Sequence, residues 1–203
     1  MVKAVASDFP VHDLIQKRWS PRAFSERPVP HEILQSLFEA ARWSPSSNNE
    51  QPWAFLVATK DDREDYAKML STLVEFNQAW AKSAPVLAIA VSEMAFAKNG
   101  NPNRNAFYDT GGAVAHLTSE ATARGLYVHQ MAGFEPQKAK ELFGIPEGWE
   151  PISAFTIGYL GDPQSLSETL RQREVAPQTR KPISEFVMTG RWGQAAPFAK
   201  KSG

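Results

Sequence analysis

The 203-residue sequence contains no cysteine. This absence excludes structural disulfides, thiolate nucleophiles, iron–sulfur ligation and a dithiol redox relay. If the chain transfers electrons, it therefore needs a bound cofactor.

Charge of one sign and long hydrophobic runs are also missing. The 22 lysines and arginines balance the 22 aspartates and glutamates, so no overall field would attract nucleic acid or an anionic membrane. The apolar stretch 85–91 is far too short to span a bilayer, and the N-terminus lacks a basic start followed by an apolar run. We therefore expect a cytoplasmic protein without nucleic-acid or membrane partners.

Familiar cofactor and catalytic motifs are absent too. The chain has no G-x-G-x-x-G, G-x-x-x-x-G-K-[ST], H-E-x-x-H or G-x-S-x-G segment, and its four histidines lack metal-ligand spacing. We expect no metal site. A redox enzyme remains possible if its cofactor site is assembled from distant segments.

What is present is the composition of an ordinary globular protein, with 42% apolar and 22% charged residues, and its length suits one domain, 1–203. Apolar spacing and turn residues predict an alternation of helices and strands. The predicted helices cover 8–18, 30–43, most of 60–83, 106–124 and 137–143. The predicted strands cover 53–59, 86–91, 126–131 and 152–160. Together they indicate a mixed α/β or α+β domain.

Beyond Gly161 the composition changes. Residues 162–203 contain few apolar periodic runs but several arginines and prolines. We expect this C-terminal extension to lie on the body of the protein or on a partner subunit.

The first segment with chemical character is KRWSPRAF, at 17–24. It places Arg18, Ser20 and Arg22 at alternate positions, and residues two apart share a face in an extended segment. Arginine guanidinium groups suit phosphate and carbonyl oxygens, so the three side chains could bind one ligand. A solvated basic turn is the alternative interpretation.

The second segment is PSSNNEQPW, at 45–53, between a predicted helix and a predicted buried strand. Its short hydrogen-bonding side chains could bind a polyol and ring heteroatoms without introducing charge. A loop that is polar only because loops usually are is the alternative.

Taken together, these segments resemble the FMN-binding nitroreductase family, with R-x-S-x-R followed by P-S-S-x-N-x-Q-P-W. Three later segments resemble the same family in the same order: DTGGAVAHLTSEATARG with Leu126, MAGF at 131–134 and RKP at 180–182. The resemblance covers roughly residues 12–190. It implies a nitroreductase-like α+β fold with a central mixed β-sheet flanked by helices and a C-terminal extension wrapping the partner subunit.

The resemblance implies a role for each matching residue. Arg18 and Arg180 would hold the FMN phosphate with Ser20 nearby, while Arg22 would face N1 and the C2 carbonyl of the isoalloxazine. The contacts implied along the ribityl chain and the ring edge are Pro45, Ser46, Ser47 and Asn49, with Ser46 and Ser47 as candidates for a contribution from the opposite subunit.

At the flavin N5, backbone N–H groups of Ala132 and Gly133 would act as donors, and Asn77 is matched to a contact with the pyrimidine edge. Two positions depart from many relatives: Ala132 replaces an acidic residue, and Gln178 stands where a second cation often precedes Arg180. Arg171 or Arg173 could compensate in phosphate binding, although exposed connecting charges are the simpler interpretation.

The implied function is a homodimeric, NAD(P)H-dependent FMN oxidoreductase with a ping-pong mechanism and small conjugated acceptors such as nitroaromatics or quinones. No protein nucleophile is needed, because the flavin performs the chemistry. The alternatives are reductive dehalogenation, enone reduction or flavin fragmentation on the same fold, a flavin-binding sensor without turnover, and an unrelated anion site.

Overall fold

The structure is a computed structural model that describes residues 7–199. Its internal contacts group into two compact units. The first, Arg18–Val175, is called the body below. The second, called the terminal unit, combines the described chain ends 7–17 and 176–199.

The body is built on a four-stranded sheet in the order β1-β2-β4-β3, and each neighbouring pair is antiparallel. The α+β class is confirmed. The mixed sheet that we expected is wrong for the described residues, because no pair in this sheet is parallel. The strands are β1 (Trp53–Thr59), β2 (Val86–Glu93), β3 (Tyr127–Met131) and β4 (Trp149–Gly158).

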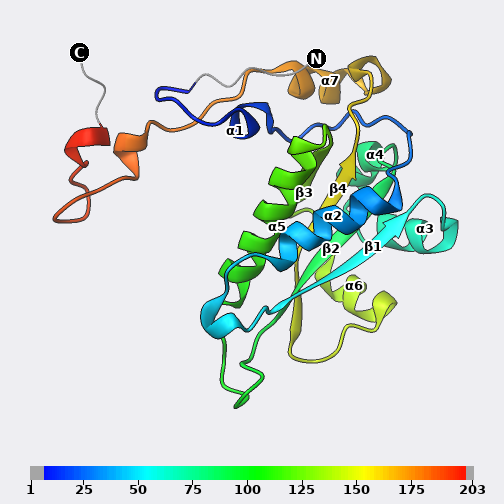
Figure 1. Cartoon of the computed structure of the whole chain (residues 1–203). Coiled ribbons are helices and arrows are strands. Elements are labelled where there is room, and N and C mark those ends of the chain that lie inside the picture. The colour runs from blue at the N-terminus through cyan, green and yellow to red at the C-terminus, as the bar shows by residue number, and fades with distance from the viewer. Residues whose placement is uncertain (1–6, 200–203) are drawn as a thin grey trace. The chain divides into compact units, whose positions relative to one another are not determined.

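The long helix α5 (Ala106–Ala123) explains this strand order (Figure 1). It connects β2 to β3, which run in the same direction, as strands joined by a crossover helix do. The later strand β4 lies between them and is antiparallel to both. The alternation of helices and strands is therefore real, but the insertion of β4 removes the parallel pair.

Helices α2 (His31–Arg42) and α5 pack against each other on one face of the sheet (Figure 1). Because successive residues of a strand point to opposite faces, β2 contributes Val86, Ala88 and Ala90 to this side. The regular spacing of apolar residues along α2 is what directs this helix onto the sheet.

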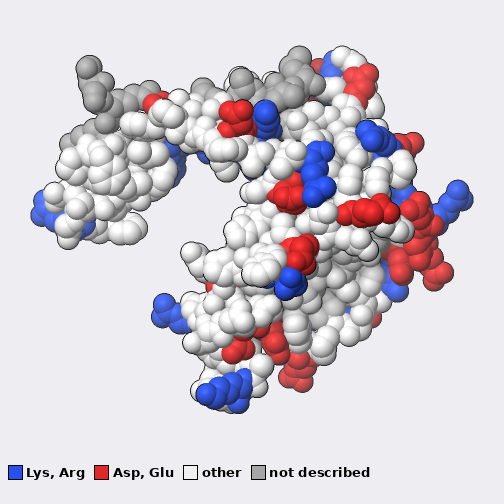
Figure 2. Space-filling view, in the orientation of Figure 1, with Lys and Arg blue, Asp and Glu red and all other residues white. Residues whose placement is uncertain are grey.

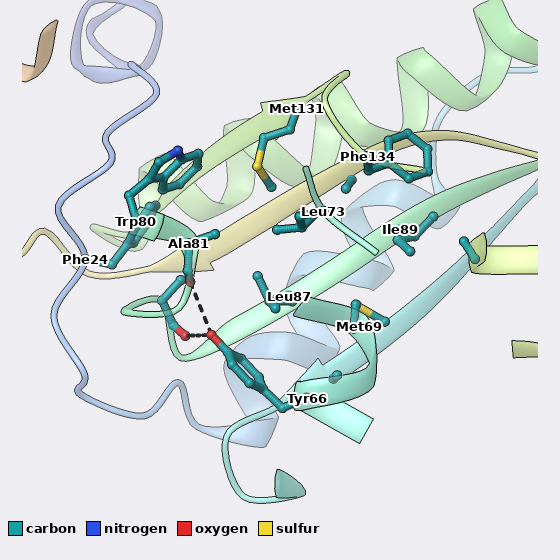
Figure 3. Packing of buried hydrophobic residues seen from close by; sticks show 14 of the residues in the cluster. Phe24, Tyr66, Met69, Leu73, Trp80, Ala81, Leu87, Ile89, Met131 and Phe134 are labelled. Atoms are coloured by element: carbon teal, nitrogen blue, oxygen red, sulfur yellow. Dashed lines mark hydrogen bonds between the residues drawn. The ribbon is translucent and has the colours of Figure 1, made fainter. Parts of the chain in front are cut away.

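The opposite face is covered by α3 (Arg63–Ser71), α4 (Glu75–Ala81) and α6 (Pro136–Phe143). Figure 3 shows Leu87 and Ile89 of β2 within this second cluster. These three helices are short, so they depend on packing against the sheet for their stability.

Most predicted elements are confirmed to within a few residues, and β1 coincides with its prediction. The first helix, α1 (Asp13–Lys17), is shorter than the predicted 8–18. Strand β4 begins at Trp149, three residues before the predicted start. Pro151 lies inside it, where the β2–β4 register shifts between Ala90 and Val91. A bulge accommodates a residue that has no N–H to donate.

Helix α7 (Glu168–Val175) was not predicted. It follows the short 3₁₀ turn η2 (Pro163–Ser165) and belongs to the body. Only Leu170 and Glu174 of α7 are buried, so the helix lacks the apolar stripe by which sequence patterns reveal helices.

The terminal unit contains α1, two 3₁₀ turns and a small loop. The turns are η3 (Ile183–Glu185) and η4 (Pro197–Ala199), and the loop is closed by a bridge between Met188 and Ala195. Of the predicted extension 162–203, residues 162–175 group with the body and 176–199 with the N-terminal residues. Wrapping of a partner subunit stays a prediction.

Among residues 7–199, no helix is long and apolar enough to cross a membrane. The surface shown in Figure 2 carries basic and acidic side chains next to one another on the body. This distribution agrees with the balanced composition.

Candidate functional site

The segment 18–23 alternates in burial. Positions 19, 21 and 23 are buried, whereas Arg18 and Arg22 are half-buried and Ser20 is exposed. The three side chains therefore share the more open side of the segment, as the alternate spacing predicted.

The buried carboxylate of Glu174 holds the backbone of this segment in place. The Arg22 N–H donates to Glu174 Oε2 at 2.9 Å, and the Ala23 N–H donates to Glu174 Oε1 at 3.1 Å. Glu174 belongs to α7 and is only 2% exposed. Hydrogen bonds to an ionised acceptor are stronger than neutral ones, so α7 holds the backbone next to the Arg22 side chain firmly in place.

The Arg22 guanidinium is half-buried, and this burial lowers its pKa below the ordinary value for arginine. The nearby Glu174 carboxylate opposes the shift, and the positive charge of Arg173 reinforces it. Its Nε is buried and has no hydrogen-bond partner among the described residues. A buried donor without an acceptor costs about 1–3 kcal/mol. The arrangement is therefore suited to a ligand that brings an acceptor atom to Arg22.

His129 of β3 approaches the same segment from the sheet. Its Nδ1 lies 2.7 Å from the Pro21 carbonyl oxygen. Burial lowers the His129 pKa from 6.5 to about 4, with the positive charge of Arg22 acting in the same direction against the hydrogen bonds to the Pro21 and Ser20 backbone. The ring is therefore neutral at pH 7. Because a carbonyl oxygen only accepts, Nδ1 carries the proton and donates it.

This lowered pKa predicts a dependence of stability on pH. Between pH 6.5 and about 4 the unfolded chain binds a proton at His129 that the folded chain does not. The free energy of unfolding therefore rises with pH in this window, and up to about 3 kcal/mol is lost as the pH falls through it. We expect the difference in unfolding free energy between the wild type and His129→Asn to change across this range in chemical denaturation. A difference independent of pH would contradict the prediction.

A chain of contacts leads from His129 to the MAGF turn (Figure 3 labels Trp80, Met131 and Phe134). The His129 and Trp80 rings have centroids 4.5 Å apart. Trp80 Nε1 donates to Asn77 Oδ1 at 3.3 Å, and Asn77 Nδ2 donates to the Gly133 carbonyl oxygen at 2.9 Å. Helix α4 thus contacts the MAGF turn directly and the segment 18–23 through the His129 ring.

Gly133 is closely surrounded in this turn. A Cβ at position 133 would lie 2.6 Å from Asn77 Nδ2 and 3.0 Å from Val74 Cγ2. The Gly133 carbonyl also accepts from the Val74 N–H at 3.1 Å. A side chain at position 133 would therefore have to displace the Asn77 amide. The Asn77 amide supports it, and direct contact of Asn77 with a flavin stays a prediction.

The loop 44–52 has an unusual backbone. Asn48, Asn49 and Gln51 have positive φ angles of 54°, 57° and 51°. Such conformations are costly for residues other than glycine and persist only where their surroundings enforce them. Pro45 and Asn49 are exposed, and the predicted Ser46 and Ser47 are half-buried.

Asp109 of α5 is one group that enforces this conformation. Its Oδ2 accepts from the Ser47 N–H at 3.0 Å, and the residue is 5% exposed. The Gln51 N–H also donates to Ser46 Oγ at 3.0 Å. The loop is thereby held against the N-terminal half of α5.

The two predicted segments do not meet within one body. The loop 44–52 leads into β1 and is attached to α5, whereas 18–23 lies against β3, at the other edge of the sheet. Three strand spacings of about 4.8 Å separate these edges by about 14 Å. In addition, α5 covers one face, whereas His129 contacts Trp80 of the cluster on the opposite face.

The other candidate ligands of the FMN phosphate are Arg180, Arg171 and Arg173. Arg180 belongs to the terminal unit, where its Nη1 donates to the Thr179 carbonyl oxygen at 2.7 Å, so its role stays a prediction. Arg171 donates to Gln164 at 2.6 Å and pairs with Glu168 of its own helix. Arg173 lies over the Phe76 ring, 5.1 Å from its centroid. Arg171 and Arg173 thus both have partners within the body.

Sequence reasoning missed Glu174 and His129. Glu174 sits in a run of charged residues that is typical of an exposed helix. His129 lies in a strand and has no other candidate binding residue beside it in the sequence. Neither residue carries a local signal, because both act through contacts with residues more than a hundred positions away.

The model of the nitroreductase family matches residues 15–159. A putative NADH dehydrogenase/NAD(P)H nitroreductase of Stenotrophomonas maltophilia is 30% identical over 162 residues, which cover 71% of this chain and 81% of that protein. An uncharacterized 15.4 kDa protein of Mycolicibacterium smegmatis is 32% identical over 136 residues, covering 66% and 88%.

Among solved structures, an oxidoreductase containing FMN superposes with a TM-score of 0.88 at 36% identity, covering 93% of this chain and 96% of that one. The family model spans more than half of the chain and includes the segment 18–23, the loop 44–52 and the turn at Gly133. This chain belongs to the nitroreductase family, as the resemblance predicted.

Proposed function

We propose that this protein is an FMN-dependent oxidoreductase that takes a hydride from NAD(P)H and reduces small conjugated acceptors, with nitroaromatics and quinones as the candidate classes. The nitroreductase family and the FMN-containing structure that this chain resembles support FMN as the cofactor. The name of the Stenotrophomonas relative supports NAD(P)H as the donor. The observation that carries the proposal is the buried, unpartnered Nε of Arg22.

The residues present fit FMN. Arg22 offers a fixed cation whose buried donor needs an acceptor, which N1 or the C2 carbonyl of the flavin would supply. The side of Gly133 on which a Cβ would lie is filled by Asn77 and Val74, which hold the turn whose N–H groups would face the flavin. Arg18, Ser20 and Arg180 would hold the phosphate. Pro45, Ser46, Ser47 and Asn49 would line the ribityl chain and the ring edge.

The protein's own contribution to the reaction is binding, orientation and charge stabilisation. When bound, FMN would accept a hydride from NAD(P)H and then pass electrons to the acceptor in a second half-reaction. Arg22 would stabilise the negative charge that reduction places near N1 and O2. The Ala132 and Gly133 N–H groups would donate toward N5, which explains why the side chain at 132 need not be acidic.

We propose that the site is shared between two copies of the chain. The segment 18–23 and the loop 44–52 lie at opposite edges and on opposite faces of one body, so the sheet and its helices separate them within one copy. In a homodimer, Ser46 and Ser47 of one subunit would complete the site of the other.

The exposed face of α5 supports such an assembly. Phe107 and Tyr108 are 51% and 83% exposed, and the small residues Gly111 and Ala115 continue the same exposed side of the helix. Exposed aromatic side chains are enriched at protein–protein interfaces, and the small residues would let a second helix approach closely. A folded, flavin-loaded monomer at micromolar concentration would contradict the shared site.

The decisive experiment is an anaerobic titration of the purified protein with NADPH and then NADH, following the oxidised flavin absorption band. We expect stoichiometric bleaching, and recovery on addition of a quinone or a nitroaromatic. Arg22→Ala should bind FMN at least about tenfold more weakly, because a buried charge-assisted contact is worth about 1.5–3 kcal/mol. Arg27→Ala is the matched control, since the Arg27 guanidinium packs over the Tyr159 ring, away from the site.

The other outcomes point to specific alternatives. A yellow protein whose flavin stays oxidised after addition of NAD(P)H would favour a flavin-binding sensor. A colourless protein that does not bind added FMN would refute the proposal. Substrate trials distinguish nitroaromatic or quinone reduction from dehalogenation and enone reduction. Consumption of FMN under oxygen without an acceptor would indicate flavin fragmentation. The cytoplasmic location expected from the sequence stays a prediction.

A further inference from the structure

The peptide group that joins Pro21 to Arg22 is held at both of its ends. Its carbonyl oxygen, on Pro21, accepts from His129 Nδ1 at 2.7 Å. Its N–H, on Arg22, donates to Glu174 Oε2 at 2.9 Å. The two partners come from different elements, since His129 lies on β3 and Glu174 on α7.

A peptide group is planar, so hydrogen bonds at its carbonyl and its N–H together fix the rotation of the whole plane. This rotation determines the direction in which the Arg22 side chain leaves the backbone. The second oxygen of Glu174 accepts from the Ala23 N–H at 3.1 Å, which fixes the next peptide group as well. The Arg22 Cα is therefore held on both sides.

The ring of His129 is itself held in place. Trp80, which is 1% exposed, packs against it with ring centroids 4.5 Å apart and an interplanar angle of 35°. The neutral ring places its single N–H on Nδ1 and adds no positive charge to that of Arg173 near Arg22. Since Trp80 also donates to Asn77, which supports Gly133, the His129 ring belongs to the same packed group as the turn.

We propose that His129 and Glu174 are positioning residues for Arg22, because together they clamp the Pro21–Arg22 peptide and so set the direction of the guanidinium. This inference rests on the proposed function insofar as Arg22 faces the flavin. Neither residue needs to contact the cofactor for this effect. Their effect on flavin binding and on the flavin reduction potential passes through Arg22.

Two substitutions of His129 separate the hydrogen bond from the ring. His129→Asn keeps an N–H donor at the same number of bonds from the backbone as Nδ1 but loses the ring. His129→Phe keeps a ring for Trp80 but has no donor. If the hydrogen bond to the Pro21 carbonyl oxygen is what matters, His129→Asn still holds the Pro21–Arg22 peptide in place and His129→Phe does not.

The first measurement needs no cofactor. Amide hydrogen exchange of Arg22 in the flavin-free protein reports on the clamp directly, because the exchanging N–H is the one that Glu174 binds. We expect exchange at Arg22 to be about tenfold faster in His129→Phe and close to wild type in His129→Asn. Unchanged protection in a folded His129→Phe protein would overturn the clamp, whether or not the protein binds FMN.

The second measurement is FMN affinity in a double-mutant cycle with Arg22→Ala. We expect His129→Phe to raise the Kd for FMN about tenfold and to make the flavin midpoint potential more negative. In the Arg22→Ala background the same substitution should change the Kd by less than about twofold. An equal fold-change in both backgrounds would show that His129 acts independently of Arg22.

Controls separate this inference from the proposed function. A wild-type protein that binds no FMN refutes the proposed function, while the exchange data still decide on the clamp. If His129→Phe fails to fold, Glu174→Gln tests the other end of the same peptide, because it replaces one acceptor oxygen with an amide. Glu174→Gln should also accelerate amide hydrogen exchange at Arg22. Normal protection of this amide in the variant would refute the proposed role of the two residues.

Discussion

Replacing Glu174 with alanine should lower the free energy of unfolding by about 3 kcal/mol. Glu174 is buried, and its carboxylate accepts from the backbone N–H groups of Arg22 and Ala23. The substitution leaves both donors without their acceptor, and an unsatisfied buried donor costs about 1–3 kcal/mol. Urea denaturation of the flavin-free protein measures the loss.

A control on the same helix makes this test specific. Glu168 also lies on α7, but its side chain is 60% exposed and pairs with Arg171 on the surface. Because exposed ion pairs contribute little, Glu168→Ala should cost less than about 1 kcal/mol. Equal losses in the two variants would mean that α7 matters only as a helix and that the buried carboxylate has no special role.

The second large effect is expected at Gly133. In Gly133→Ala the new Cβ would lie 2.6 Å from Asn77 Nδ2, which must then leave the Gly133 carbonyl oxygen and move Oδ1 away from Trp80. The loss of two hydrogen bonds destabilises the protein by about 2 kcal/mol. Displacement of the turn should also weaken FMN binding about tenfold, measured by quenching of flavin fluorescence.

A double variant tests the cause. In an Asn77→Ala background the obstructing amide is gone, and the nearest contact of the new Cβ becomes Val74 Cγ2 at 3.0 Å. Gly133→Ala should therefore cost clearly less stability in this background than in the wild type. The same cost in both backgrounds would place the strain elsewhere in the turn.

The elements that the sequence predicted are those with a pattern of apolar residues over several consecutive positions. β1 is a nearly continuous apolar run over seven residues, and α2 carries apolar residues at helical spacing over twelve. Both form close to where the sequence predicts them. α7 has no such pattern, since its burial rests on one leucine and one charged residue. The position of β4 between β2 and β3 depends on contacts distant in sequence, so the alternation of elements could not predict an all-antiparallel sheet.

For the site, the sequence by itself indicated which segments are candidates for binding a flavin. The alternation of Arg18, Ser20 and Arg22 and the polar loop at 45–53 are local patterns, and their order along the chain was enough to indicate the family. The tertiary structure alone decided what fixes these segments. Glu174 lies 152 positions from Arg22, His129 lies 108 positions from Pro21 and Asp109 lies 62 positions from Ser47. A buried polar group finds its partner through the packing of whole elements, and no local pattern encodes that packing.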